Sequence, residues 1–179
     1  LEELACELDR EIATTTALCR RYADLVDPER RWQTVVNALP APDRKIHPEE
    51  HYRRAIDALV QHCVEHGLAP PELPNQCPVT VRTIPDYMRP VRSNAAFSMP
   101  PVHPPRGGTF FILEAGKGAR IPADYRLLTA HETYPGHHLL DTSRWRHERR
   151  VRRHIEFPIY YEGWASFAEE LLFETGLFS

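Results

Sequence analysis

One stretch of the sequence decides both the fold and the chemistry: Leu127-Leu128-Thr129-Ala130-His131-Glu132-Thr133-Tyr134-Pro135-Gly136-His137-His138. A helical pattern runs from Asp124 to about Trp145 and is interrupted at Pro135-Gly136. Imidazoles are zinc ligands, and a neighbouring carboxylate can accept the proton of a zinc-activated water. The stretch therefore predicts a catalytic metal site on a broken helix.

The spacing of the histidines requires the break. His131 and His137 are six residues apart, so on an undistorted helix they would point about 120° away from one another. His138 returns to within about 20° of His131 but lies about 10.5 Å along the axis, too far for imidazoles that each bind an ion at about 2.1 Å. Pro135 and Gly136 permit a bulge of two residues, which would make His137 equivalent to an i+4 ligand. Whether His137 or His138 is the second ligand stays open here.

A second predicted helix, Pro158 to Gly176, supplies the third ligand. Glu162 lies near its start, and Gly163 beside it would permit close backbone approach. Other carboxylates are expected to hydrogen-bond to the outer ring nitrogens of the histidines. The candidates are Glu169, Glu170 and Asp141. Tyr160 or Tyr161 is a candidate donor to a developing oxyanion.

Two motifs resemble the signature of a known family. His-Glu-Thr-Tyr-Pro-Gly-His-His-Leu at 131–139, followed by Glu-Gly-Trp-Ala at 162–165, resembles the bacterial domain-of-unknown-function 885 (DUF885) family. With the strand-like segment 106–111, the resemblance covers residues 70 to 179. The family is regarded as gluzincin-like, mostly helical zinc metallopeptidases.

The resemblance implies a role for each residue of the site. His131, His137 and Glu162 would hold Zn²⁺, and Glu132 would be the catalytic general base. The segment Phe110 to Leu113 would present a strand edge to an extended peptide substrate.

These observations predict a zinc-dependent metallopeptidase that hydrolyses peptide bonds with a metal-activated water and Glu132 as general base. The alternative is a truncated or degenerate, non-catalytic metal-binding relative that acts through a partner. Family members are several times longer, and the chain begins without methionine, so we expect a fragment of a larger helical protein. A partner chain or a missing C-terminal part would then complete the cleft.

Six arginines gather between the two helices that carry the predicted ligands. They are Arg144, Arg146, Arg149, Arg150, Arg152 and Arg153. One interpretation is a solvated connector. The alternatives are a site where one arginine binds the C-terminal carboxylate of a peptide, or a surface for an anionic partner.

The whole chain predicts a mainly α fold with a small antiparallel β-sheet, arranged as a gluzincin-like metallopeptidase core. We expect one domain with three regions: N-terminal helices (1–69), a proline-rich extended region with short strands (70–122) and the zinc-site helices (123–179). The further helices are expected at Leu4–Leu25, from Asp27-Pro28 to about Pro40, and at Pro48–Gly67, the strands at Val79–Ile84 and Thr109–Leu113, and turns at Gly107-Gly108 and Gly116–Gly118.

Composition excludes several classes of protein. The net charge of −3 argues against a nucleic-acid or anionic-membrane binder. No apolar run approaches the ~20 residues of a membrane-spanning helix, and the mean hydropathy is −0.48. The four cysteines are widely spaced without a CxxC pair, which predicts reduced, partly buried thiols and favours a cytoplasmic location.

Overall fold

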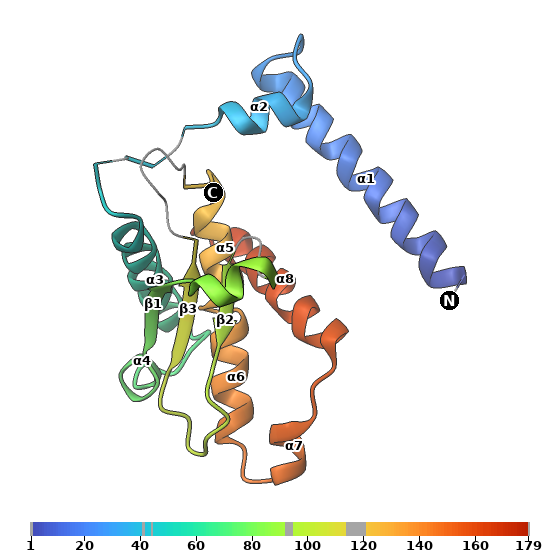
Figure 1. Ribbon diagram of the computed structural model, residues 1–179. Coiled ribbons are helices and arrows are strands. Elements are labelled where there is room, and N and C mark those ends of the chain that lie inside the picture. The colour runs from blue at the N-terminus through green and yellow to red at the C-terminus, as the bar shows by residue number, and fades with distance from the viewer. Residues whose placement is uncertain (1, 41, 44, 92–94, 114–120, 179) are drawn as a thin grey trace. The chain divides into compact units, whose positions relative to one another are not determined.

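The computed structural model describes residues 2–40, 42–43, 45–91, 95–113 and 121–178 (Figure 1). By its internal contacts the chain divides into two compact units, Leu1–Ala41 and Pro42–Ser179. The sequence suggested one domain, with residues 1–69 as one helical region. The boundary found in the structure falls inside that region, because α1 and α2 pack on each other as a unit.

The first unit is a pair of helices, α1 (Glu2–Val26) and α2 (Trp32–Ala38). The second helix begins at Trp32 rather than at Pro28, where the sequence predicted its start. Asp27 closes a turn instead, since its carboxylate accepts a hydrogen bond from the Glu29 amide at 3.2 Å and pairs with Arg30 at 2.9 Å.

A three-stranded sheet with the order β1-β3-β2 lies in the second unit. Strands β1 (Val79–Thr83) and β3 (Gly108–Ile112) match the two predicted strands, whereas β2 (Ala95–Ser98) was not predicted. β1 runs parallel to β3 and β2 runs antiparallel to it. The sheet is therefore mixed, and the prediction of a purely antiparallel sheet is wrong.

The connection between β1 and β3 explains the parallel pair. It passes through the 3₁₀ helix η1 (Asp86–Val91), strand β2 and a proline-rich loop, which is long enough to return the chain to the end of the sheet where β1 starts. Because β3 is the central strand, it is hydrogen-bonded to β1 on one side and to β2 on the other. The predicted presentation of the edge at Phe110 to Leu113 to a substrate is therefore wrong.

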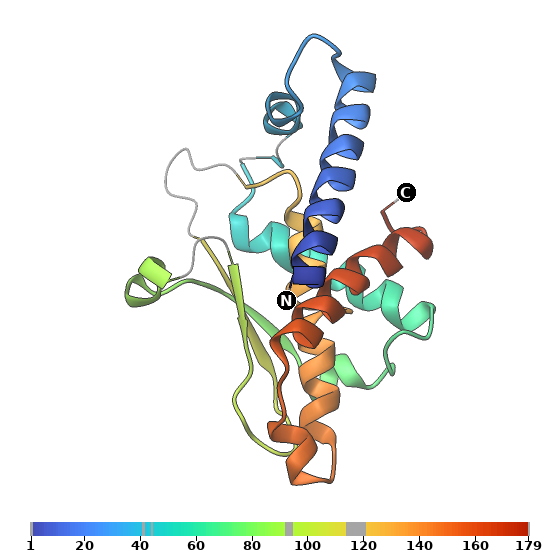
Figure 2. The ribbon, with the colours of Figure 1, turned by 90° about the vertical axis from the view of Figure 1, so that its right-hand side faces the viewer.

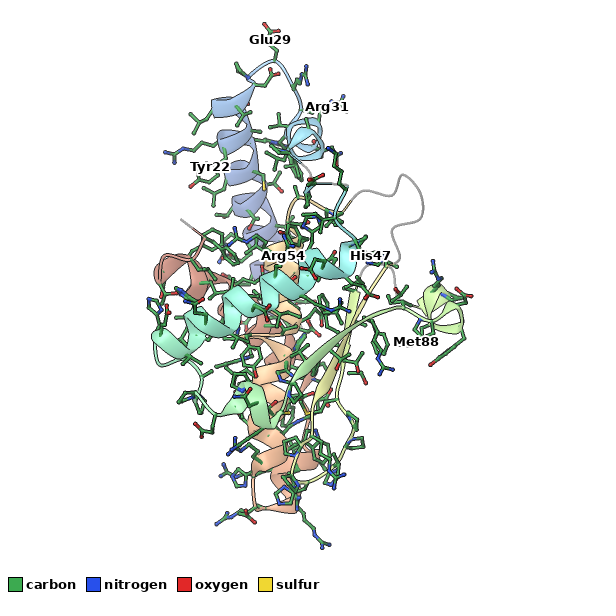
Figure 3. All side chains as sticks on the ribbon, turned by 90° about the vertical axis from the view of Figure 1, so that its left-hand side faces the viewer. Tyr22, Glu29, Arg31, His47, Arg54 and Met88 are labelled. Carbon is green, nitrogen blue, oxygen red and sulfur yellow. The ribbon has the colours of Figure 1, made fainter. Side chains whose placement is uncertain are left out.

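Helices pack on one face of this sheet (Figure 2). The helix α3 (Pro48–Glu65) packs on β1 and ends before Gly67, whose φ of 69° suits a glycine. Its outer face is polar: Arg54 extends away from the core and pairs with Glu50 (Figure 3). The core on the sheet side consists of Tyr52, Ile56, Val81, Phe110, Ile112 and Ile121.

A second core cluster joins α3 to the C-terminal helices. These are α5 (Tyr125–Glu132), α6 (His137–Arg146), α7 (Arg150–His154) and α8 (Pro158–Glu174), with the short α4 (Leu73–Gln76) beneath. The cluster comprises Leu59, Cys63, Ala69, Leu73, Ala130, Tyr134, Leu139 and Leu172. It buries the back of the segment that carries the two histidines, which holds that segment in place.

The structure confirms a mainly helical fold with a small sheet. None of the helices in the described ranges is long and apolar enough to span a bilayer. All four cysteines are free thiols, and burial raises the pKa of Cys63 to about 12. The predicted turn at Gly116–Gly118 lies outside the described residues.

The helix break between α5 and α6 is a two-residue insertion. Up to Thr133 the backbone follows the ordinary i to i−4 pattern, with its amide 2.9 Å from the Thr129 carbonyl. The amide of Gly136 then donates to the carbonyl of Ala130, six residues back, and Leu139 donates to Thr133, again six back. The helical pattern resumes with two extra residues looped out, and α6 continues nearly along the line of α5 (Figures 1 and 2).

Gly136 has no room for a side chain. A Cβ atom there would lie 1.9 Å from the carbonyl oxygen of His131 and 2.4 Å from that of Ala130. Both neighbours are backbone atoms, which cannot rotate away as a side chain would. The insertion therefore requires glycine at this position.

Gly136→Ala is expected to lower the free energy of unfolding by about 2–3 kcal/mol, because the backbone must shift to admit the methyl group. Urea denaturation measures the change. The matched control is Gly163→Ala on α8, where a Cβ meets nothing within 4 Å, and a gain of about 0.5–1 kcal/mol is expected from helix propensity. A Gly136→Ala chain as stable as the wild type would contradict the packing described for the insertion.

Candidate metal centre

The insertion brings His131 and His137 to one side of the α5–α6 segment. Their ring centroids lie 4.8 Å apart and the ring planes are perpendicular. His131 is the penultimate residue of α5 and His137 is the first residue of α6. The two imidazoles therefore converge although they are six residues apart in the sequence.

Glu162 approaches both histidines from the first part of α8. Its Oε2 atom lies 3.4 Å from Nε2 of His131 and 3.6 Å from Nε2 of His137. One ligand atom from each residue lies within 4.8 Å of the others. The side chain of Glu162 is 63% exposed, so the centre opens to solvent on the side of α8.

These separations fit a tetrahedral zinc ion. Bonds of about 2.0–2.1 Å to one tetrahedral ion place neighbouring ligand atoms roughly 3.3–3.4 Å apart. The two nitrogen-to-oxygen distances of 3.4 and 3.6 Å are close to that spacing. Two imidazoles and one carboxylate also form a donor set typical of a catalytic zinc site with one open position.

Glu169 orients the ring of His131. Its Oε1 atom lies 2.7 Å from Nδ1 of His131, so Nδ1–H donates to the carboxylate and Nε2 faces Glu162. This hydrogen bond is the main reason that the pKa of His131 is raised, and the nearby charges of Glu132 and Glu162 add to the effect. Of the three carboxylates proposed for this role, Glu169 alone has this contact among the described residues. Glu170 is exposed.

Tyr161 stacks on His137, the second candidate ligand. Its ring lies parallel to that of His137, with centroids 4.0 Å apart and planes 10° apart. The Nδ1 atom of His137 is buried and has no hydrogen-bond partner in the described part of the chain. Burial, followed by the neighbouring His131, lowers the pKa of His137 and favours the neutral ring that a metal requires.

Asp141 anchors Tyr161 instead of a histidine. It accepts a hydrogen bond from the Tyr161 hydroxyl at 3.3 Å and pairs with Arg144 at 2.8 Å. Arg144 also pairs with Glu156 at 2.8 Å. Burial raises the pKa of Tyr161, and the charge of Asp141 adds to this effect. The hydrogen bond directs the Tyr161 hydroxyl at Asp141. Tyr160, the other candidate oxyanion donor, is exposed.

His138 faces the interior rather than the centre. Its Nε2 donates to the carbonyl of Cys77 at 2.8 Å, and its ring contacts Phe97 and Tyr134. Burial lowers its pKa to about 4, so the ring is neutral. Of the two histidines, His137 therefore faces His131 and Glu162, and His138 does not.

The remaining predicted residues have different positions. Glu132 ends α5 directly after His131 and is half-buried. Gly163 admits a Cβ without contact, so the expected close backbone approach there is wrong. Among the six arginines, Arg144 is engaged in two ion pairs, and the others lie toward α7, where only Arg153 is half-buried rather than exposed.

Trp164 stabilises the helix break, a role that the sequence did not indicate. Its indole N–H donates to the carbonyls of Pro135 at 2.9 Å and Gly136 at 3.3 Å. The Pro135 carbonyl has lost its regular helical partner, because the Leu139 amide donates to Thr133 instead. The Gly136 carbonyl also accepts from the Leu140 amide at 3.1 Å. The only available signal was that the tryptophan follows Glu162 closely, on the helix that meets the break.

A solved crystal structure has a fold similar to that of this chain. The crystal structure of the "putative lipoprotein from Colwellia psychrerythraea" superposes with a TM-score of 0.67 at 17% sequence identity, over 95% of this chain and 30% of that one. The chain thus spans about 30% of the length of this solved relative. No curated protein matches the sequence. The profile of the family described as "Bacterial protein of unknown function (DUF885)" matches residues 2–179, and the chain therefore belongs to the DUF885 family.

Proposed function

We propose that the chain carries the catalytic centre of a zinc-dependent metallopeptidase. The observation that supports this most directly is the convergence of His131, His137 and Glu162 at separations suited to one tetrahedral ion. Glu132 follows the first ligand directly, and its charge already acts on His131. A general base next to a metal-bound water is the arrangement that hydrolysis needs.

Each residue has a separate task in this proposal. A bound zinc would polarise the peptide carbonyl and lower the pKa of a water molecule. Glu132 takes the proton of that water and gives it to the leaving amine. Glu169 fixes the tautomer of His131, and Tyr161 keeps the ring of His137 in place.

The peptide substrate would pair with β2 rather than with β3. Ala95–Ser98 is an edge strand of the sheet, antiparallel to β3. Its Phe97 contacts His138, the residue that follows the second ligand. An extended peptide that adds to this edge would therefore lie beside α6. A cytoplasmic location, and a partner chain or further part of the protein that completes the cleft, belong to the same proposal.

A non-catalytic metal-binding role is the second candidate. The exposure of Glu162 favours it, because an open centre leaves a substrate less enclosed than efficient hydrolysis requires. In that case the ligands would bind metal and the chain would act through a partner. Metal content and hydrolysis, measured separately, distinguish the two candidates.

The wild-type chain is expected to bind one zinc ion. His137→Ala is expected to weaken zinc binding more than about a hundredfold, because loss of a ligand costs more than the 10–100-fold typical for loss of a residue that hydrogen-bonds to a ligand. Equilibrium dialysis with metal analysis measures both values. His154→Ala on α7, an exposed histidine outside the centre, should bind zinc as the wild type does. Absence of stoichiometric zinc in the wild type would refute the proposal.

Glu132→Gln is expected to retain zinc and to lower kcat on peptides by about 10²–10⁴, because the amide cannot accept the proton of the water. A panel of fluorogenic peptides provides the assay. Glu174→Gln on the exposed end of α8 is the matched control and should keep wild-type activity. Full activity in Glu132→Gln would exclude Glu132 as the base, whereas a zinc-loaded wild type without activity would favour the non-catalytic role.

Glu169→Gln is expected to weaken zinc binding by about 10–100-fold while leaving the fold intact, since the hydrogen bond to His131 loses its charge. The same dialysis experiment tests this, and circular dichroism checks the fold. Unchanged zinc affinity would show that Glu169 does not orient the ligand.

A further inference from the structure

A pocket of about 470 Å³ opens beside the metal centre, between α6, the segment that follows α7 and the start of α8. Its walls are mostly apolar and include Leu140, Ser143, Ile155, Phe157, Tyr160 and Tyr161. The volume lies in the range of sites that hold small ligands, about 300–1,000 Å³. Several of these apolar side chains, such as Phe157 and Tyr160, are exposed, and exposed apolar groups that gather at a hollow indicate binding.

The pocket adjoins the candidate metal centre at Tyr161. The same ring that lines the pocket stacks on His137 with centroids 4.0 Å apart. Leu140 lies one helical turn after His137 on α6, and Tyr161 precedes Glu162 directly on α8. A group in the pocket is therefore separated from a metal ligand by one aromatic ring.

The polar part of the pocket lining includes two arginines, one histidine and one carboxylate. Arg144 lies in its wall but is bound by Asp141 and Glu156, each at 2.8 Å. Arg152 and His147 also line the pocket, and Arg152 is exposed to solvent. An apolar guest is favoured, because most of the pocket lining is apolar and a charged guest would give up its hydration there.

We propose that this pocket binds an apolar or aromatic side chain of the substrate, next to the peptide bond that is cleaved. The inference rests on the proposed peptidase function for the identity of the substrate. The pocket itself belongs to this chain's own residues, so its ligand preference is measurable without zinc and without turnover.

The first experiment measures binding to the metal-free chain by NMR titration. The probes are the N-acetyl amides of phenylalanine, alanine, glutamate and lysine. Wild type is expected to bind the phenylalanine amide at least tenfold more tightly than the other three. Ser143→Trp, which fills the pocket from an exposed position of α6, should remove this preference. Ala58→Trp, an exposed helical position on α3, is the matched control and should keep it.

The second experiment compares kcat/KM for peptides that carry phenylalanine or alanine beside the cleaved bond. Ser143→Trp is expected to lower the value for the phenylalanine peptide more than tenfold and to leave the alanine peptide within twofold. An equal loss for both peptides, or a probe preference that survives Ser143→Trp, overturns the pocket assignment. If the wild type cleaves no peptide but binds the phenylalanine probe selectively, the pocket stands and the peptidase proposal fails.

Discussion

The candidate centre depends on one backbone hydrogen bond, from the amide of Gly136 to the carbonyl of Ala130. An ordinary helix would direct His131 and His137 about 120° apart. This bond reaches six residues back instead of four, so two residues lie outside the helical repeat. The rings of His131 and His137 therefore fall on the same side of the segment. Glu162 and Trp164 on α8 then meet a surface that exists only because of the insertion.

The helix α8 contributes two carboxylates to one imidazole. Glu162 and Glu169 are seven residues apart, which places them on the same face of a helix, two turns from one another. Glu162 lies against Nε2 of His131 and Glu169 against Nδ1. The ring is therefore held from both nitrogens by one rigid element. The two histidines and Glu162 were named from the helix break and the family resemblance, whereas the choice between Glu169, Glu170 and Asp141 needed the orientation of α8.

Features that depend on long-range packing could not be predicted from the residues. The sheet has a parallel pair because its connection runs through β2, and Ala95–Ser98 has only one large apolar residue to mark it as a strand. The stacking of Tyr161 on His137 joins residues from different helices, and neither residue type by itself predicts such a pair. His138 differs from His137 only by facing the core, about 100° around the helix, a direction that the length of the insertion decides.

Tyr161 links the geometry of the centre to the preference of the pocket. Its hydroxyl is held by Asp141, Asp141 pairs with Arg144, and Arg144 pairs with Glu156. The ion pairs of Arg144, a residue of the pocket wall, thus also fix the ring that stacks on His137. An apolar side chain in the pocket would pack against Tyr161, whereas an anionic one would compete with Asp141 and Glu156 for Arg144. If the two proposals hold, selection of an apolar guest and support of the candidate ligand His137 both depend on the ring of Tyr161.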